Sequence, residues 1–590
     1  MKIGIFFGGP AREREISFAG GKTAMENIDK TLFTPVPIFV DGLGNFILLD
    51  EALVYSPTIR DFYPPKSYQG TYQVYSESLT TMTDAELDEM LVGVGKRLSP
   101  SDFKTYFDFA FIAMHGPGCE DGSIQGLLEW YGVPYSGPSV MGSSIGIDKI
   151  AQNDLIKLAV GLDKKTTTLS REAFAKEDSA VLFEEIKAAV GLPFVVKAPH
   201  QGSSIGVAFV KKDDVADFEK AIKQCLFMLE VTAEEWNSTD KEAFVQRMAN
   251  LDEGIGFPVA LGDDLIHHPA NLLDKLDSHF NTTSDNAVLV SNNAEDAVLI
   301  EGFVKGQEFS CGVIQTPDGV SVALPPTEII PAVEVFDFKA KYQSSSTRKK
   351  IPIDTTLENL ITVQADVKKA FDSLKLGVCT RIDGFLTPDN RVILHDPNTI
   401  PGMSPTSLIF KQMAEIGMNV TDAITYFIRQ SIRERIRTGK NTVRFDQLLK
   451  SLDAAIAERI VNLATRKKVA IVFGGFDAET KEESYVTARK HYGKLASSSD
   501  SLPVPIFVIG TAEAPAWYSL PTNLLFKEFA EDIEKALALE VHPLIEQTRK
   551  NAASVTLHFT GALVGAVQIT SPATIASTCQ ELIFCAEGLG

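Results

Sequence analysis

The chain contains an internal repeat, which constrains its fold more than any other feature of the sequence. Residues 468–475, Lys-Val-Ala-Ile-Val-Phe-Gly-Gly, match residues 2–9, Lys-Ile-Gly-Ile-Phe-Phe-Gly-Gly. Residues 503–508 then repeat residues 35–40 identically as Pro-Val-Pro-Ile-Phe-Val. Two matches in the same order indicate that one structural unit occurs twice in this chain.

Each copy opens with the pattern of an α/β domain. A short apolar run ends in two glycines at residues 8–9, and helical periodicity begins at Ile16. Apolar runs at residues 36–40 and 109–113 have the character of parallel strands, and the second leads directly into a glycine-rich turn at His115. The expected fold class is therefore α/β, with a parallel-sheet, Rossmann-like domain first and a second copy of it last.

Length and charge exclude several kinds of protein. The 590 residues are enough for about three to five domains. Lys and Arg number 56 against 77 Asp and Glu, a net charge of −21 that disfavours nucleic acid and anionic membranes as partners. The six cysteines form no Cys-x-x-Cys pair, and the N-terminus does not have the pattern of a signal peptide. We therefore expect a cytoplasmic protein without a disulfide framework or a zinc site.

The segment between the two copies is less regular. Strands expected at residues 192–197 and 207–210 enclose a loop rich in Gly and Ser, which predicts a hairpin. Residues 213–297 mix one plausible helix with Asn- and Asp-rich stretches, and we expect an insertion with loops there. Thr421 and Asp422 are expected to cap an amphipathic helix, and a linking helix is expected near residues 445–465.

Two groups of residues in this segment could bind a nucleotide. The loop at residues 200–206, after the strand with Lys197, can close its amides and hydroxyls over phosphates, although an ordinary hairpin loop has the same pattern. Asp383, Asp396 and Asn398 stand at the ends of two successive strands. Such oxygen ligands suit magnesium beside a nucleotide, but Asp and Asn are also common turn residues.

Two further segments could contact substrates. Residues 401–408 predict a loop leading to a helix N-terminus, whose amides can hold a carboxylate or an oxyanion; plain helix capping is the alternative. Glu301 and Glu308 flank a connector that begins Phe303-Val304 and could accept a purine. Two exposed carboxylates are the alternative there.

Six motifs in a fixed order resemble the D-alanine:D-alanine ligases, which are ATP-grasp enzymes. They are Glu13-Arg14-Glu15-Ile16-Ser17; His115-Gly116 with Glu120-Asp121-Gly122; Lys197 with Gly202-Ser203-Ser204-Ile205-Gly206; Lys341-Tyr342; Arg381-Ile382-Asp383; and Asn398-Thr399 with Pro401-Gly402-Met403. The resemblance covers about residues 1–440, with poor matches at 41–105 and 213–297.

The resemblance implies a carboxylate–amine ligase for peptidoglycan precursor synthesis. In such an enzyme ATP phosphorylates the carboxylate of one D-alanine, and a second D-alanine attacks the acyl phosphate. By resemblance, the residues that hold the nucleotide are Lys149, Lys197, Ser203, Ser204, Glu301, Phe303, Val304, Glu308 and Lys341. Two Mg²⁺ ions, with Mn²⁺ as an alternative, would bind to Asp383, Asp396 and Asn398.

The resemblance also assigns the substrate contacts. Glu13 would pair with the ammonium of the first D-alanine, with Ser203 and Tyr342 hydrogen-bonded to it. Arg381 and the Gly402 amide would stabilise the tetrahedral oxyanion. The remaining substrate-binding positions implied are His115, Glu120, Ser407 and the Leu408 amide, the last two for the second carboxylate. The transition state is anionic at both centres, and preorganised cations and amides are the usual largest stabilising contribution.

Two positions depart from the family pattern. Asp396 stands where the family generally has Glu, and its shorter side chain makes bridging of two metals harder. Ala198 follows Lys197 where the family has Pro, so the phosphate loop is expected to shift slightly. Neither change removes a charge.

Other functions of different classes compete with this interpretation. A related ligase could use a D-hydroxy acid or another D-amino acid as its second substrate, but Tyr342 favours the amide product. A non-catalytic ATP-binding scaffold would be expected to lose ligands in both copies, and the first copy keeps them all in type.

The second copy is expected to fold without activity. Lys481 replaces the counterpart of Glu15, and Glu587 replaces that of His115. The resemblance implies a homodimer joined through this domain, so the second copy is either an internal pseudo-dimer partner or the front of an incomplete second ligase. The expected boundaries are residues 1–147 (N-terminal domain), 148–303 (central domain with insertion), 304–440 (catalytic domain), 441–466 (linking helix) and 467–590 (second copy).

Overall fold

The first sheet is centred on β1 (Lys2–Gly8). This strand pairs in parallel with β2 (Thr34–Val40) and with β5 (Phe109–Ile112). The antiparallel strands β3 (Phe46–Leu49) and β4 (Gly95–Leu98) extend the sheet to the order β4-β3-β2-β1-β5. Its apolar strands are buried, as expected for a sheet covered by helices such as α1 (Arg14–Asn27). The expected parallel-sheet domain is confirmed.

The computed structural model describes eleven stretches of the chain. They are residues 1–79, 82–161, 164–251, 254–330, 348–404, 407–439, 441–556, 559, 565–569, 572–587 and 589. No helix among these residues is long and apolar enough to cross a membrane.

The second copy repeats the first sheet strand for strand. β20 (Lys467–Gly474) pairs in parallel with β21 (Ser501–Gly510) and β24 (Glu581–Phe584). β22 (Pro515–Ser519) and β23 (Val567–Ile569) continue it antiparallel, in the order β23-β22-β21-β20-β24. The register is also repeated, because Ile3 lies opposite Pro35 as Val469 lies opposite Pro503. The repeat in the sequence is therefore a repeat of the fold.

The two copies contact each other through equivalent helices. α1 packs on α19 (Ala478–Ala496), its counterpart in the second copy. Asn27 and Gly493, which follow their Gly-Gly turns at the same spacing, face each other, and a Cβ on Gly493 would lie 2.9 Å from Asn27 Oδ1. The amide of Lys30 donates to the Ser497 carbonyl over 3.2 Å. Contact between equivalent positions is characteristic of an approximate two-fold relation.

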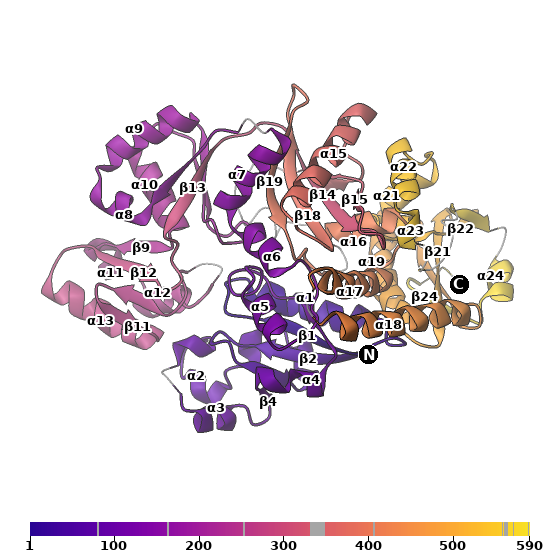
Figure 1. Cartoon of the computed structure of the whole chain (residues 1–590), viewed down its shortest axis with the longest axis horizontal. Helices are drawn as coiled ribbons and strands as arrows, with labels where there is room; N and C mark the ends of the chain where they lie inside the picture. The colour runs from indigo at the N-terminus through magenta and orange to yellow at the C-terminus, as the bar shows by residue number, and fades with distance from the viewer. Residues whose placement is uncertain are drawn as a thin grey trace.

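Two of the antiparallel sheets in the segment that follows the first domain along the chain lie at the upper left and upper centre of Figure 1. The first has the order β6 (Thr166–Ser170), β13 (Ala297–Gly302), β7 (Phe194–Lys197) and β8 (Val207–Val210), and packs against α9 (Ser179–Val190) and α10 (Val215–Cys225). The second has the order β17 (Arg348–Lys350), β16 (Thr327–Ile330), β14 (Gln307–Gln315), β18 (Cys379–Leu386) and β19 (Val392–Asn398), with β15 (Ser321–Ala323) on β14. α7 (Lys149–Val160), which contacts β19, and α15 (Leu357–Ser373) pack together on this second sheet.

The insertion is not mainly loops, contrary to expectation. It forms a sheet of four short strands, β9 (Met228–Val231), β12 (Ala287–Ser291), β10 (Val259–Leu261) and β11 (Asp264–Ile266), with α11 (Ala233–Ser238), α12 (Lys241–Met248) and α13 (Pro269–Thr282). Its core includes the buried Trp236, and Val74 of the first domain joins the same cluster. Gln73 and Gln246 exchange two 3.0 Å hydrogen bonds. The two stretches that resemble the family poorly therefore pack on each other.

Three helices connect the sheet that contains β14, β18 and β19, which we call the catalytic sheet, with the second copy. They are α16 (Leu408–Glu415), α17 (Val420–Arg437) and α18 (Thr442–Leu463), and α18 runs beside both copies in Figure 1. The N-cap of α17 is Asn419, which accepts from the Asp422 amide (2.9 Å), so the expected cap at Thr421 and Asp422 lies inside the helix. Arg459 of α18 pairs with Asp29 and, at 3.0 Å, with Asp422.

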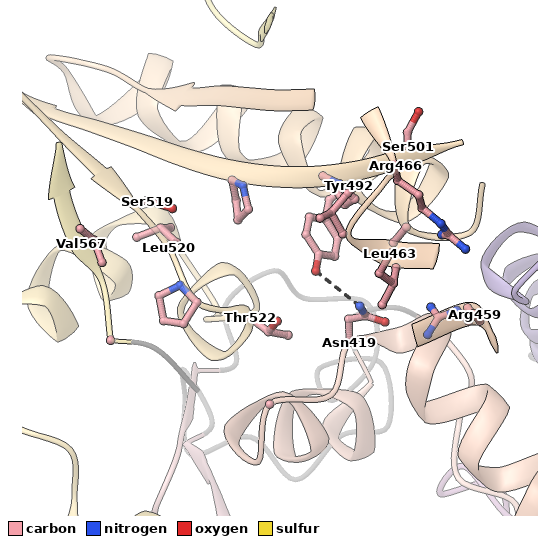
Figure 2. Close-up of a pocket in the computed structure, with 17 residues that line it drawn as sticks. Asn419, Arg459, Leu463, Arg466, Tyr492, Ser501, Ser519, Leu520, Thr522 and Val567 are labelled. Atoms are coloured by element: carbon pink, nitrogen blue, oxygen red, sulfur yellow. Dashed lines mark hydrogen bonds between the residues drawn. The ribbon is translucent and has the colours of Figure 1, made fainter. Parts of the chain in front are cut away.

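A cavity of about 260 Å³ lies between this helical connection and the second copy (Figure 2). Asn419 and Tyr492 meet in it through a 3.5 Å hydrogen bond, and Arg459 and Arg466 lie at one end. None of the predicted site residues lines this cavity. It is therefore separate from the candidate active site.

Candidate active site

Glu13 lies buried at the start of α1, immediately after the glycine turn that ends β1. Ser203 Oγ donates a 2.7 Å hydrogen bond to Glu13 Oε1, whereas no group in the described part of the chain donates to Oε2. Burial and the charge of Glu120 raise the pKa of Glu13, while His115, Ser203 and Lys149 act in the opposite direction. A buried acceptor without a donor suits a cationic ligand such as an ammonium group.

His115 and Glu120 lie close enough to Glu13 for their charges to act on it. His115 Nδ1 lies 3.5 Å from Glu120 Oε1, and the Gly116 amide donates to Glu120 Oε2 over 2.9 Å. Burial lowers the pKa of His115, but the Glu120 hydrogen bond and the charges of Glu120 and Glu13 raise it above its usual value overall. The structure therefore places Glu13, His115 and Glu120 after the carboxyl ends of β1 and β5.

A second group places lysines against carboxylates. Lys197, at the end of β7, lies 2.8 Å from Glu301 Oε2 and 3.6 Å from Asp396 Oδ2. Lys149, the first residue of α7, lies 3.4 Å from Asp396 Oδ1, and Lys164 lies 2.5 Å from Glu301 Oε1. Three cations face two carboxylates, which leaves one net positive charge for an anionic ligand.

The carboxylates of this group stay ionised. Burial alone would raise the pKa of Glu301, but Lys164 and Lys197 outweigh the effect of burial and lower this pKa to about 2. Burial likewise opposes ionisation of Asp396, and Lys149, Lys197 and His395 hold its pKa well below the usual range. The sequence predicted Lys149, Lys197, Glu301 and Asp396 but missed Lys164, which belongs to no motif.

The loop between β7 and β8 connects the two groups. Ser203 and Ser204 take positive φ angles of 50° and 60°, which are unfavourable for residues other than glycine. Lys149 Nζ donates to the Gln201 carbonyl over 2.6 Å, and Gln201 Nε2 donates to Glu295 Oε1 over 3.1 Å. Glu295 is a further residue that the sequence did not indicate, since no motif contains it.

Asp383 and Asn398 meet on adjacent strands of the catalytic sheet. Asp383 accepts hydrogen bonds from Ser310 Oγ (2.6 Å), Arg381 Nε (3.2 Å) and Asn398 Nδ2 (3.3 Å). Asp396 is the extra residue of a bulge in β19, with φ of 43°. The bulge explains why Asp396 contacts the lysines rather than Asp383.

The oxygen donors here fit a magnesium ion. The described residues contain no group of three His, Cys, Asp or Glu arranged to hold a metal. Mg²⁺, however, is usually bound by one or two carboxylates together with substrate phosphates, and Asp383 with Asn398 supplies a carboxylate and an amide at one place. The lysine group lies beside them through Asp396.

The other predicted residues are more dispersed. Ser407 is the N-cap of α16, and its Oγ lies 3.0 Å from Ser404 Oγ and 3.4 Å from where a Cβ on Gly402 would be. The remaining predicted nucleotide contacts lie on the connector and the strand after β13: Phe303, Val304 and Glu308. Lys341 and Tyr342 lie outside the described residues.

A parallel-sheet domain, followed by two antiparallel sheets with lysines and carboxylates between them, defines an enzyme of the ATP-grasp type. The "D-ala D-ala ligase N-terminus" model matches residues 2–138, and the "D-ala D-ala ligase C-terminus" model matches residues 159–245 and 280–429. The chain belongs to the D-alanine–D-alanine ligase family. Both matches end before the second copy, and the gap between 245 and 280 falls in the insertion.

Several similar proteins are named D-alanine–D-alanine ligases. A D-alanine–D-alanine ligase of Geobacillus thermodenitrificans is 25% identical over 447 residues, which cover 76% of this chain and 99% of the relative. A D-alanine–D-alanine ligase A of Brucella melitensis is 24% identical over 440 residues, covering 73% and 98%. The structure of the D-alanine–D-alanine ligase from Coxiella burnetii aligns with a TM-score of 0.48 at 19% identity, over 74% of this chain and 96% of that chain.

Proposed function

We propose that this enzyme joins two D-alanine molecules to D-alanyl-D-alanine, with ATP as the phosphoryl donor, for peptidoglycan precursor synthesis. The observation that supports this best is the buried Glu13 carboxylate, with one oxygen held by Ser203 and the other without a donor among the residues that the structure describes. That oxygen can receive the ammonium of a first D-alanine. The substrate's own carboxylate then points toward the lysine group.

Phosphorylation of that carboxylate is electrostatically supported by the lysines. Lys149 and Lys197 neutralise phosphate oxygens, the loop with Ser203 and Ser204 covers them, and Lys341 completes the set. Mg²⁺ held by Asp383, Asn398 and Asp396 supplies further charge neutralisation when bound. The leaving group is ADP, and the product of this step is an acyl phosphate.

The second step is attack by the amine of a second D-alanine. Ser407 and the Leu408 amide receive its carboxylate, because the N-terminus of a helix favours an anion. Arg381 and the Gly402 amide donate to the oxyanion of the tetrahedral intermediate, which collapses to the peptide with loss of phosphate. The reaction consumes ATP, and we place it in the cytoplasm.

The second copy serves as an internal substitute for a dimer partner. The contact of α1 with α19, in which the equivalent positions Asn27 and Gly493 meet, supports an approximate two-fold relation. We expect a monomer in solution, because the face of α1 that could contact another subunit is already covered. The substrates are the only partners we propose.

The test is a phosphate-release assay with the purified chain. Phosphate formation should require ATP, magnesium and D-alanine together, and D-alanyl-D-alanine should be found by mass spectrometry. The same assay with other D-amino acids and D-hydroxy acids measures the specificity of the second site. Phosphate release that is independent of D-alanine, or no product with it, contradicts the proposal.

A further inference from the structure

The second copy contacts α16, the helix that begins at the proposed site of the second D-alanine, which we call the acceptor substrate. α16 starts at Leu408 and carries two buried charges, Lys411 and Glu415. Lys411 pairs with Glu528 of the second copy, and Glu415 Oε1 lies 2.6 Å from Lys527 Nζ. Both partners come from the turn between α20 (Thr522–Leu525) and α21 (Ala530–Leu537).

The Glu528 carboxylate also contacts β17, a strand of the catalytic sheet. Glu528 Oε1 lies 3.5 Å from Lys349 Nζ on β17, and Asp532 Oδ1 lies 3.5 Å from Arg348 Nη2 on that strand. β17 follows residues 331–347 in the sequence, the segment with Lys341 and Tyr342. Glu528 therefore connects α16 and β17 from outside the sheet.

A continuous set of contacts leads from α16 to the catalytic centre. Gln412, next to Lys411, donates to the Ser310 carbonyl (2.8 Å) and accepts from the Gly312 amide (2.8 Å). Ser310 Oγ in turn donates to Asp383 Oδ1 over 2.6 Å. A shift of α16 would therefore move the Ser407 end directly, and it would reach Asp383 only indirectly, through Gln412 and Ser310.

The turn that carries Glu528 is itself fixed. The buried Tyr485 hydroxyl lies 2.7 Å from the Leu525 carbonyl and 2.6 Å from the Lys527 carbonyl. Burial lowers the pKa of Lys411 to about 8, although the charge of Glu528 raises it. Removing one partner of a buried pair is strongly unfavourable.

We propose that the second copy is a positioning domain, in which Glu528 fixes α16 and thereby the acceptor end of the active site. Glu528 is a positioning residue, since it acts through Lys411 and Lys349 rather than on the substrate. This inference rests on the proposed ligase function for its kinetic test. It gives the otherwise inactive copy a role in the reaction.

The test compares Glu528→Gln with Glu531→Gln in the full chain. Glu531 is a matched control, because it is exposed and its ion pair with Lys535 (2.5 Å) lies within α21. Glu528→Gln should raise the KM for the second D-alanine about tenfold and leave the KM for ATP within twofold, whereas Glu531→Gln should change neither. An unchanged acceptor KM, or equal increases in both constants, overturns the proposal.

A double variant separates positioning from folding. Lys411→Met with Glu528→Gln leaves no unpaired buried charge, because the other partner of Glu528, Lys349, is partly exposed. The thermal midpoint of the double variant should therefore recover relative to Glu528→Gln, while the KM for the second D-alanine stays raised. Recovery of both together means that the pair is only structural and overturns the inference.

Hydrogen exchange gives a measurement that needs no activity. The amides of α16 should exchange faster in Glu528→Gln than in Glu531→Gln, and equal exchange overturns the inference. If the unmodified chain forms no D-alanyl-D-alanine, the proposed function fails, and the exchange result still decides whether Glu528 holds α16.

Discussion

The hydroxyl of Ser203 donates to the carboxylate of Glu13 over 2.7 Å and so joins two domains across 190 residues of sequence. Ser203 lies in the loop between β7 and β8, and Glu13 begins the first helix of the N-terminal domain. The hydrogen bond orients Glu13, and no described residue donates to its other oxygen. In the proposed reaction that oxygen receives the ammonium of the first D-alanine.

Ser203→Ala should weaken binding of the first D-alanine. A hydrogen bond to a charged group contributes about 1.5–3 kcal/mol, so the KM for the first substrate should rise at least about tenfold. Steady-state kinetics at saturating ATP measures it. A rise under twofold would show that Glu13 is oriented without Ser203.

Arg381→Ala should slow the reaction strongly. Loss of one oxyanion donor typically lowers turnover by about two to three orders of magnitude. Circular dichroism and thermal unfolding control for folding, since Arg381 also donates to Asp383 Oδ1 over 3.2 Å. A decrease under tenfold in a folded variant removes Arg381 from the mechanism.

Asp396→Asn should raise the magnesium requirement. The bulge turns this side chain toward Lys149 and Lys197. A magnesium ion beside the nucleotide phosphates would use the same carboxylate as a ligand. The magnesium concentration for half-maximal rate should rise about tenfold. If it does not change, Asp396 acts only as the counterion of the lysines.

The general fold could be predicted from the sequence because buried apolar strands lead into glycine turns, and the repeated Pro-Val-Pro-Ile-Phe-Val segment predicted the second sheet. Glu13 follows the Gly8-Gly9 turn and His115 follows β5, but the roles of these residues were predicted from the family resemblance. The strands of the insertion could not be predicted, because Val259–Leu261 and Asp264–Ile266 are too short to show a period.

Long-range electrostatic partners were also beyond the sequence. Lys164 and Glu295 carry no local signal, and the bulge at Asp396 depends on pairing between two strands. The pairing of Lys411 with Glu528 depends on how the second copy docks. Such contacts are decided by packing between domains rather than by local pattern.

Glu301 should make stability depend on acidic pH. Its pKa is lowered to about 2 in the folded chain, below the ordinary value of 4.5, so its contribution is complete above about pH 4.5 and is lost as the pH falls toward 2. Glu301→Gln should therefore lower the thermal midpoint at pH 7, and the gap to the unmodified chain should narrow between pH 4.5 and 3. A constant gap would contradict the assigned ion pairs.

Asn27 and Gly493 should be energetically coupled across the two copies. Gly493→Ala alone adds a Cβ 2.9 Å from Asn27 Oδ1, and this close contact offsets the gain of about 1 kcal/mol that Ala brings to a helix. In an Asn27→Ala background the contact is gone, so the same substitution should stabilise the chain by about that amount. Chemical denaturation of the four chains in the double-mutant cycle measures the coupling. Additive effects would mean that the two helices do not meet at these positions in solution, and the internal pseudo-dimer would lose its contact at the two-fold relation.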